Sequence, residues 1–251
     1  MRHQSKSLCY CCEQPATTTE HIPPKCFFPE KKYLPEGSPD YRKNLITVAS
    51  CEMHNTSRSF DDQYAATCIA MHSDNELAMS IFTSKWFKSL LRRDGSLGKR
   101  VFSTARETTI LSRENGIFIP EKTLAISWEM KRVEHVIESI ARGLYYHESS
   151  GKEKWTKSCA IKSSKLLMKD LSKPQDSGLV NQLNQAFKHG EKHIELGLNK
   201  KGENPDAFYY QIIRLKTGES YIRMVFYNDF DFLAVLYDEC IVPKSIIIPR
   251  I

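Results

Sequence analysis

Two short motifs constrain how this chain of 251 residues can fold. Cys9-x-x-Cys12 and Cys51-x-x-His54 each place two soft ligands at the spacing at which a tight turn presents both to one ion. Five of the eight cysteines lie before residue 52, and the N-terminus lacks the apolar core of a secretory leader. We therefore expect a structural zinc centre and not a disulfide framework. Cys11 is expected to be packed or spare, because two intervening residues suit a metal-binding turn.

The segments between and after these pairs predict a small ββα unit. Short extended segments are expected near residues 18–22 and 44–48, separated by a connection rich in Pro and Gly. A helix is expected to begin at Asn55, with its apolar residues, Phe60 and Tyr64 among them, facing the core. Residues 1–72 would thus form a zinc-stapled module. The alternative, that the cysteines are only buried thiols, is disfavoured by their paired spacing.

Chemically active side chains lie inside this frame. Glu20 and His21 precede Ile-Pro-Pro after the first pair, Asn55 follows the second pair directly, and Asp61 and Asp62 lie on the expected helix. The order of these motifs resembles the HNH (ββα-metal) endonuclease family. It runs from a Cys pair, through an acidic residue and His before Ile-x-Pro, to a second metal-binding pair followed by Asn. The resemblance covers about residues 7–72, and Thr-Glu-His-Ile-Pro-Pro-Lys is similar to a segment of its bacterial members.

The resemblance implies a treble-clef-like fold and a role for each of these residues. His21 would be the general base that activates water, Asn55 would hold the segment bearing His21 or orient its imidazole, and Glu20 would bind the catalytic divalent ion. The last position of the family's motif is often His or Asn. This sequence differs there, and its candidates are Asp61 and Asp62. Asp62 is preferred as the second ligand because it lies seven residues after Asn55, on nearly the same helix face. Carboxylate ligands predict Mg²⁺ or Mn²⁺ as the catalytic ion.

The remainder, residues 73–251, is expected to be an α+β region that selects the target or a protein partner, and it resembles no domain of known function. A helix is predicted to begin at Ser73, because Ser73-x-x-Glu76 is a capping-box pattern. Apolar residues at helical spacing form one stripe from Val133 to Leu144, which must pack against a core. The predicted helices span residues 73–94, 127–148 and 176–190, and a hairpin of residues 207–215 and 221–227 is extended by residues 232–237.

The net charge of +6 comes entirely from this second region, because residues 1–72 hold eight basic and eight acidic residues. Basic residues concentrate in residues 84–113, where Arg92, Arg93, Lys99 and Arg100 are the candidate contacts to nucleic acid. A second lysine-rich stretch covers residues 151–173. The alternative for both stretches is a solvated surface that only keeps the protein in solution.

These patterns favour an HNH endonuclease that hydrolyses DNA phosphodiester bonds. RNA is a second candidate substrate, because the metal site acts on the phosphodiester and does not require deoxyribose. The alternative is a non-catalytic zinc-knuckle adaptor for nucleic acid or protein, which explains Cys9, Cys12, Cys51 and His54 but gives Glu20, His21 and Asp62 no role. No apolar run approaches the roughly 20 residues of a membrane span, so a cytoplasmic protein is expected.

We also expect a regulatory protein partner, because an unrestrained nuclease is toxic to its own cell. Proteins that join an N-terminal HNH module to an unfamiliar extension resemble bacterial and phage weapons and defence effectors. The resemblance therefore implies a role in antiviral defence.

Overall fold

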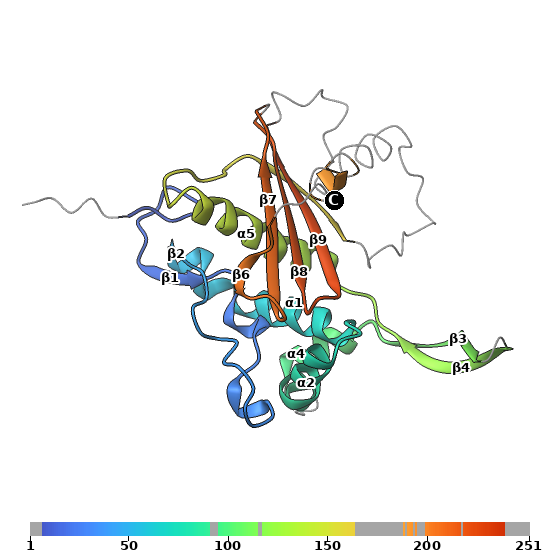
Figure 1. Cartoon of the computed structure of the whole chain (residues 1–251). Helices are drawn as coiled ribbons and strands as arrows, with labels where there is room; N and C mark the ends of the chain where they lie inside the picture. Colours follow the sequence, from blue (N-terminus) through green and yellow to red (C-terminus); the bar gives the residue numbers. More distant parts are fainter. Residues whose placement is uncertain are drawn as a thin grey trace, which may run out of the picture.

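The structure is a computed structural model that describes residues 7–90, 95–114, 117–163, 188, 190–192, 194, 199–216 and 218–238. These residues form a mixed α+β fold whose sheets are all antiparallel, which confirms the expected fold class at that level (Figure 1). Within the described part of the chain, no helix is both long and apolar enough to cross a membrane.

The N-terminal region is a strand pair followed by a helix, in the order expected. β1 (Thr18–His21) pairs with β2 (Thr47–Ser50), and the connection between them carries the short 3-10 helices η1 (Lys25–Phe27) and η2 (Lys31–Tyr33). Two further 3-10 turns, η3 (Glu52–His54) and η4 (Thr56–Arg58), precede helix α1 (Ser59–Met71).

The prediction that the helix begins at Asn55 is therefore wrong. Asn55 joins the two 3-10 turns at φ −118° and ψ −76°, and its side chain bonds to β1 instead of capping α1. The argument that placed Asp62 on the same helix face as Asn55 consequently fails, because no continuous α-helix joins them. The position of Asp62 has to be judged from its own contacts.

The N-cap of the next helical segment lies two residues later than its capping pattern predicts. Helix α2 (Glu76–Ile81) has Asn75 as its N-cap, whose side chain accepts from the N–H groups of Leu77 and Ala78 at 2.9 and 3.4 Å. The Ser73 hydroxyl instead donates to the carbonyl of Ile69 at 2.7 Å, so the predicted capping box is wrong. The chain continues through the π-helix η5 (Phe82–Trp86), α3 (Phe87–Leu90) and α4 (Ser96–Phe102).

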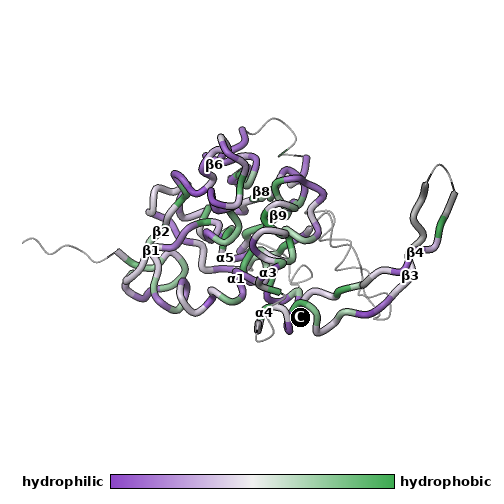
Figure 2. Tube along the Cα trace, turned by 90° about the horizontal axis from the view of Figure 1, so that it is seen from below, coloured by the Kyte–Doolittle hydropathy of each residue, from purple (hydrophilic) through white to green (hydrophobic). Residues whose placement is uncertain are grey.

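A β-hairpin that the sequence analysis did not predict follows α4. Strands β3 (Arg106–Glu114) and β4 (Ile117–Ala125) pair over their whole length. Figure 2 shows this hairpin as an arm that projects from the body of the protein.

Helix α5 (Met130–Glu148) is the centre of the fold. Its predicted apolar stripe is confirmed, since each stripe residue from Val133 to Leu144 is at most 1% exposed. Figure 1 shows α5 between the β1–β2 hairpin and the large sheet, and one hydrophobic core runs through the zinc-binding region, α1, α5 and that sheet. This core crosses residue 72 without interruption.

The large sheet has the strand order β5-β9-β8-β7-β6. The expected hairpin and its third strand are confirmed as β7 (Phe208–Arg214), β8 (Ser220–Phe226) and β9 (Phe230–Tyr237). The edge strands β5 (Ser158–Ser163) and β6 (Lys201–Asn204) were not predicted. The helix expected over residues 176–190 lies almost entirely outside the described residues.

Candidate metal centre and neighbouring carboxylates

The fold brings the two predicted metal-binding pairs together at the end of the β1–β2 hairpin. The N-terminal turn with Cys9 and Cys12 is fixed to β2 by a hydrogen bond from the Tyr10 N–H to the carbonyl of Ala49, 2.9 Å long. Cys51 immediately follows β2, and His54 lies in η3. A short local turn therefore presents each pair, and the strand pairing holds the turns against each other.

The four side chains lie close enough together to surround one ion. Cys51 Sγ lies 3.8 Å from Cys12 Sγ and 3.2 Å from His54 Nδ1, and Cys9 Sγ lies 3.8 Å from the same nitrogen. All four ligand atoms lie within 4.8 Å of one another. A tetrahedron with Zn–S bonds of about 2.3 Å has edges of about 3.8 Å. The set could therefore hold a metal ion, and its three sulfurs and one imidazole are consistent with structural zinc.

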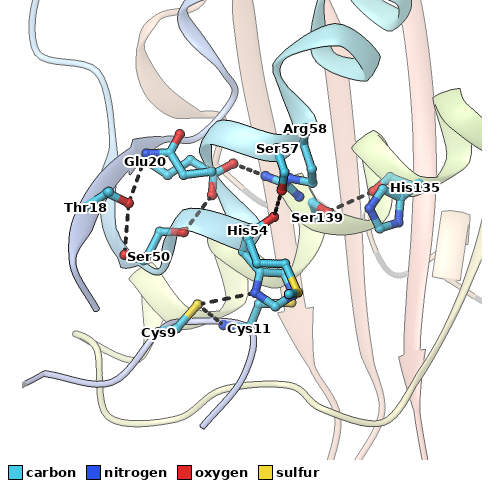
Figure 3. Close-up of polar contacts among 12 residues, drawn as sticks. Cys9, Cys11, Thr18, Glu20, Ser50, His54, Ser57, Arg58, His135 and Ser139 are labelled. Carbon is cyan, nitrogen blue, oxygen red and sulfur yellow. Dashed lines mark hydrogen bonds and ion pairs between the residues drawn. The ribbon is translucent and has the colours of Figure 1, made fainter. Parts of the chain in front are cut away.

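Cys11 is not one of these four ligands, in agreement with the preference for Cys9 and Cys12. Its backbone N–H points to Cys9 Sγ at 3.5 Å, a contact that supports a thiolate bound to metal (Figure 3). Burial raises the pKa of the Cys11 thiol, so this side chain stays neutral. Among the described residues, only Cys9, Cys12, Cys51 and His54 form a group of three or more His, Cys, Asp or Glu side chains that could hold a metal ion.

Glu20 points into the protein next to this centre. Only 4% of it is exposed, and its carboxylate accepts hydrogen bonds from the guanidinium of Arg58 and, at 3.3 Å, from the hydroxyl of Ser50 (Figure 3). Burial raises the pKa of Glu20 to about 7, and the Arg58 cation opposes that rise. Arg58 is itself only 5% exposed, so this is a buried ion pair.

Asp62 lies on α1 beside the same pair. It is 8% exposed, and its Oδ1 atom is buried with no hydrogen-bond partner in the described part of the chain. Burial raises the pKa of Asp62 to about 6, and Arg58 again opposes the rise. Asp61 differs, because it is half-exposed and pairs with Arg132 at 2.7 Å. Two buried carboxylates, Glu20 and Asp62, thus share the charge of one arginine.

His21 is the last residue of β1, and Asn55 is hydrogen-bonded to the beginning of the same strand. The Asn55 amide donates to Thr18 Oγ1 at 3.1 Å and to the Thr19 carbonyl at 3.2 Å, which ties the metal-binding turn to the strand that ends at His21. His21 is half-buried, and burial followed by the Lys25 cation lowers the pKa of its imidazole. A lowered pKa favours the neutral form, which can accept a proton.

Of the four predicted contacts to nucleic acid, the structure describes Lys99 and Arg100. Arg92 and Arg93 lie outside the described residues. Lys99 and Arg100 lie in the last turn of α4, where the Arg100 guanidinium sits 5.4 Å from the ring centroid of Phe60. Phe60 is 57% exposed, so the expectation that it faces the core is wrong.

Arg58 is the residue of this site whose role the sequence analysis missed. Its three guanidinium nitrogens are buried or paired, and two of them, Nε and Nη1, have no hydrogen-bond partner in the described part of the chain. The only signal in the sequence was one basic residue just before the acidic start of α1.

Comparison with models of known protein families, with curated proteins and with solved structures finds no match to this chain. The case for a function therefore depends on the geometry of the site and on the resemblance of its motifs.

Proposed function

We propose that this protein is a metal-dependent endonuclease that hydrolyses DNA phosphodiester bonds, and that residues 7–72 carry the chemistry. The observation that supports it most is the buried Oδ1 atom of Asp62, which has no partner among the described residues. An unpaired buried carboxylate oxygen is costly unless a donor or a cation satisfies it. Glu20, which carries the second carboxylate near Arg58, directly precedes His21 in the chain.

His21 would accept the proton of the attacking water, a step that imidazole suits near neutral pH. Asn55 would keep His21 in position through its two hydrogen bonds to β1. Glu20 and Asp62 would hold Mg²⁺ or Mn²⁺, because Mg²⁺ is commonly bound by one or two carboxylates together with water and substrate phosphate. Such an ion stabilises the negative charge that develops on the phosphate and on the leaving oxygen.

The zinc centre would have a structural role in this proposal. Its four protein ligands would fill all four positions of a tetrahedral ion and leave none open for water or substrate. It would hold the N-terminal turn and η3 together, and through Asn55 it would set the position of β1.

A non-catalytic zinc adaptor is the second candidate, and the pairing of Glu20 favours it. Both carboxylate oxygens of Glu20 already accept hydrogen bonds, one from Arg58 and one from Ser50. Glu20 would therefore have to release Arg58, at least in part, before it could bind a divalent ion. In the adaptor this pair has only a structural purpose.

Incubation of the purified protein with plasmid DNA and with structured RNA, each with and without Mg²⁺, separates these candidates. His21→Ala should lower the cleavage rate by about 10²- to 10⁴-fold while zinc content and DNA affinity persist, because general-base catalysis contributes on that scale. His147→Ala, at an exposed position in the last turn of α5 that has no part in the proposed chemistry, is the control and should cleave at the wild-type rate.

Each other result has a defined meaning. Wild-type cleavage by His21→Ala refutes the nuclease assignment at this site, and zinc-loaded wild-type protein that cleaves neither substrate favours the adaptor. If the protein cleaves RNA but not DNA, the substrate is RNA and the proposed mechanism is unchanged. Asp62→Ala should raise the Mg²⁺ concentration needed for activity, and if Asp61→Ala does so instead, the ligand is Asp61.

A further inference from the structure

A cavity of about 290 Å³ lies beside α1, between the η1–η2 connection and the π-helix η5. Its volume is near the lower end of the range of about 300–1,000 Å³ found for small-molecule sites. Gln63 of α1 forms part of its wall and directly follows Asp62 in the chain. The other wall residues that matter below are Cys26, Tyr33, Lys85, Trp86 and Lys88.

The π-helix η5 supplies three wall residues of this cavity, Ser84, Lys85 and Trp86. Helical turns of this type are rare and are frequent at functional sites. Trp86, the last residue of η5, is 2% exposed, and its indole N–H has no hydrogen-bond partner in the described part of the chain.

The charges around the cavity favour an anion. Lys85 and Lys88 line it, and Lys88 is exposed. The wall also holds one carboxylate, Glu30, but three cations already surround it: Lys32 at 2.7 Å, Arg42 at 3.4 Å and Lys85 at 3.9 Å. The two lysines of the wall, Lys85 and Lys88, therefore outnumber its single carboxylate. The cavity has a net positive charge that an anionic ligand would neutralise.

The remaining wall suits a flat, polar group. Tyr33 offers a ring, and the Gln63 amide offers both a donor and an acceptor. The Cys26 thiol adds no charge, because burial raises its pKa to about 12. A ligand that unites a phosphate with a planar, hydrogen-bonding ring matches both parts of the cavity.

We infer that this cavity binds one nucleotide unit, with its phosphate at Lys85 and Lys88 and its base at Tyr33 and Gln63. The unit can come from a free mononucleotide or from a nucleic-acid strand. In the second case the inference rests on the proposed function, and the cavity would hold a nucleotide next to the bond that is cleaved.

Binding is measured by calorimetry on the full chain without added divalent ions, so that cleavage plays no part. The probes are AMP, adenosine, inorganic phosphate and a single-stranded DNA hexanucleotide. AMP or the hexanucleotide should bind, whereas adenosine and phosphate should each bind at least about tenfold more weakly. Lys85→Gln/Lys88→Gln should weaken binding at least about tenfold, since a hydrogen bond to a charged group is worth that factor or more. The control Lys152→Gln, a change of the same charge at an exposed turn residue, should have no effect.

A footprint on the wild-type protein tests the same site without any substitution. AMP or the hexanucleotide should protect Lys85 and Lys88, but not Lys152, from acetylation measured by mass spectrometry. Tighter binding of the hexanucleotide identifies a strand as the source, and equal or tighter binding of AMP identifies a free nucleotide. The inference is overturned if neither AMP nor the hexanucleotide binds. It is also overturned if Lys85→Gln/Lys88→Gln leaves binding unchanged and Lys85 is not protected in the wild type. Since no readout depends on cleavage, failure of the proposed nuclease activity would leave this result standing.

Discussion

Replacing Arg58 by Ala should destabilise the protein far more than a typical loss of an ion pair. Arg58 is the one buried cation beside Glu20 and Asp62 among the described residues, and the side chains of Arg58 and Glu20 are only 6% and 4% exposed. Removing one partner of such a pair leaves the other charge uncompensated, at a cost of about 3–5 kcal/mol. Burial has already raised the pKa of Glu20 to about 7 and that of Asp62 to about 6, so either carboxyl can take up a proton when its cation is lost. We therefore expect a cost within that range, about 4 kcal/mol, and not above it.

The neighbouring pair of Arg132 and Asp61 provides a matched control. These side chains are 32% and 31% exposed, so solvent screens their attraction, and Arg132→Ala should cost less than about 1 kcal/mol. Urea unfolding at constant zinc content measures both variants. For a chain of this size, about 4 kcal/mol corresponds to a drop of roughly 8–16 °C in Tm.

The double substitution Glu20→Gln/Arg58→Met tests whether the loss comes from uncompensated charge. It removes both charges at once and should be more stable than Arg58→Ala, because a buried pair can often be exchanged for neutral groups of similar volume at little cost. Equal stabilities of Arg58→Ala and Arg132→Ala would refute the reasoning, and so would a double variant that is no more stable than Arg58→Ala.

Three further predictions concern the metal, the core and the basic surface. The wild type should carry about one zinc per chain, and Cys51→Ser should lose it and no longer unfold cooperatively; a zinc-free variant with a cooperative melt would contradict this. A Cβ at Gly143 would lie 2.6 Å from Ile22 Cδ1, so Gly143→Ala should cost about 1–3 kcal/mol in urea unfolding, and the added change Ile22→Ala should cost less than the sum of the two single changes. Lys99→Glu/Arg100→Glu should weaken DNA binding and flatten its salt dependence, and an unchanged salt slope would make these residues part of a solvated surface only.

Features of the protein that depend on local spacing could be predicted from the sequence. Cys9-x-x-Cys12 and Cys51-x-x-His54 identified the four clustered ligands, because a turn of four residues presents its own pair whatever surrounds it. The stripe from Val133 to Leu144 identified the central helix, and the change to β-branched and aromatic residues identified the hairpin of β7 and β8. Helical and strand periodicity are properties of the chain segment itself, so they can be recognised without knowledge of the fold.

Features that depend on partners distant in the chain could be known only from the folded protein. Glu20 and Arg58 lie 38 residues apart, and no spacing in the sequence indicates that they pair. Asp61 and Asp62 are adjacent and chemically alike, yet Arg132, 71 residues away, pairs with one while the other is buried beside Arg58. The spacing of residues along one segment contains no information on which distant side chain will meet them, because that depends on how α1, α5 and the sheet pack into one core.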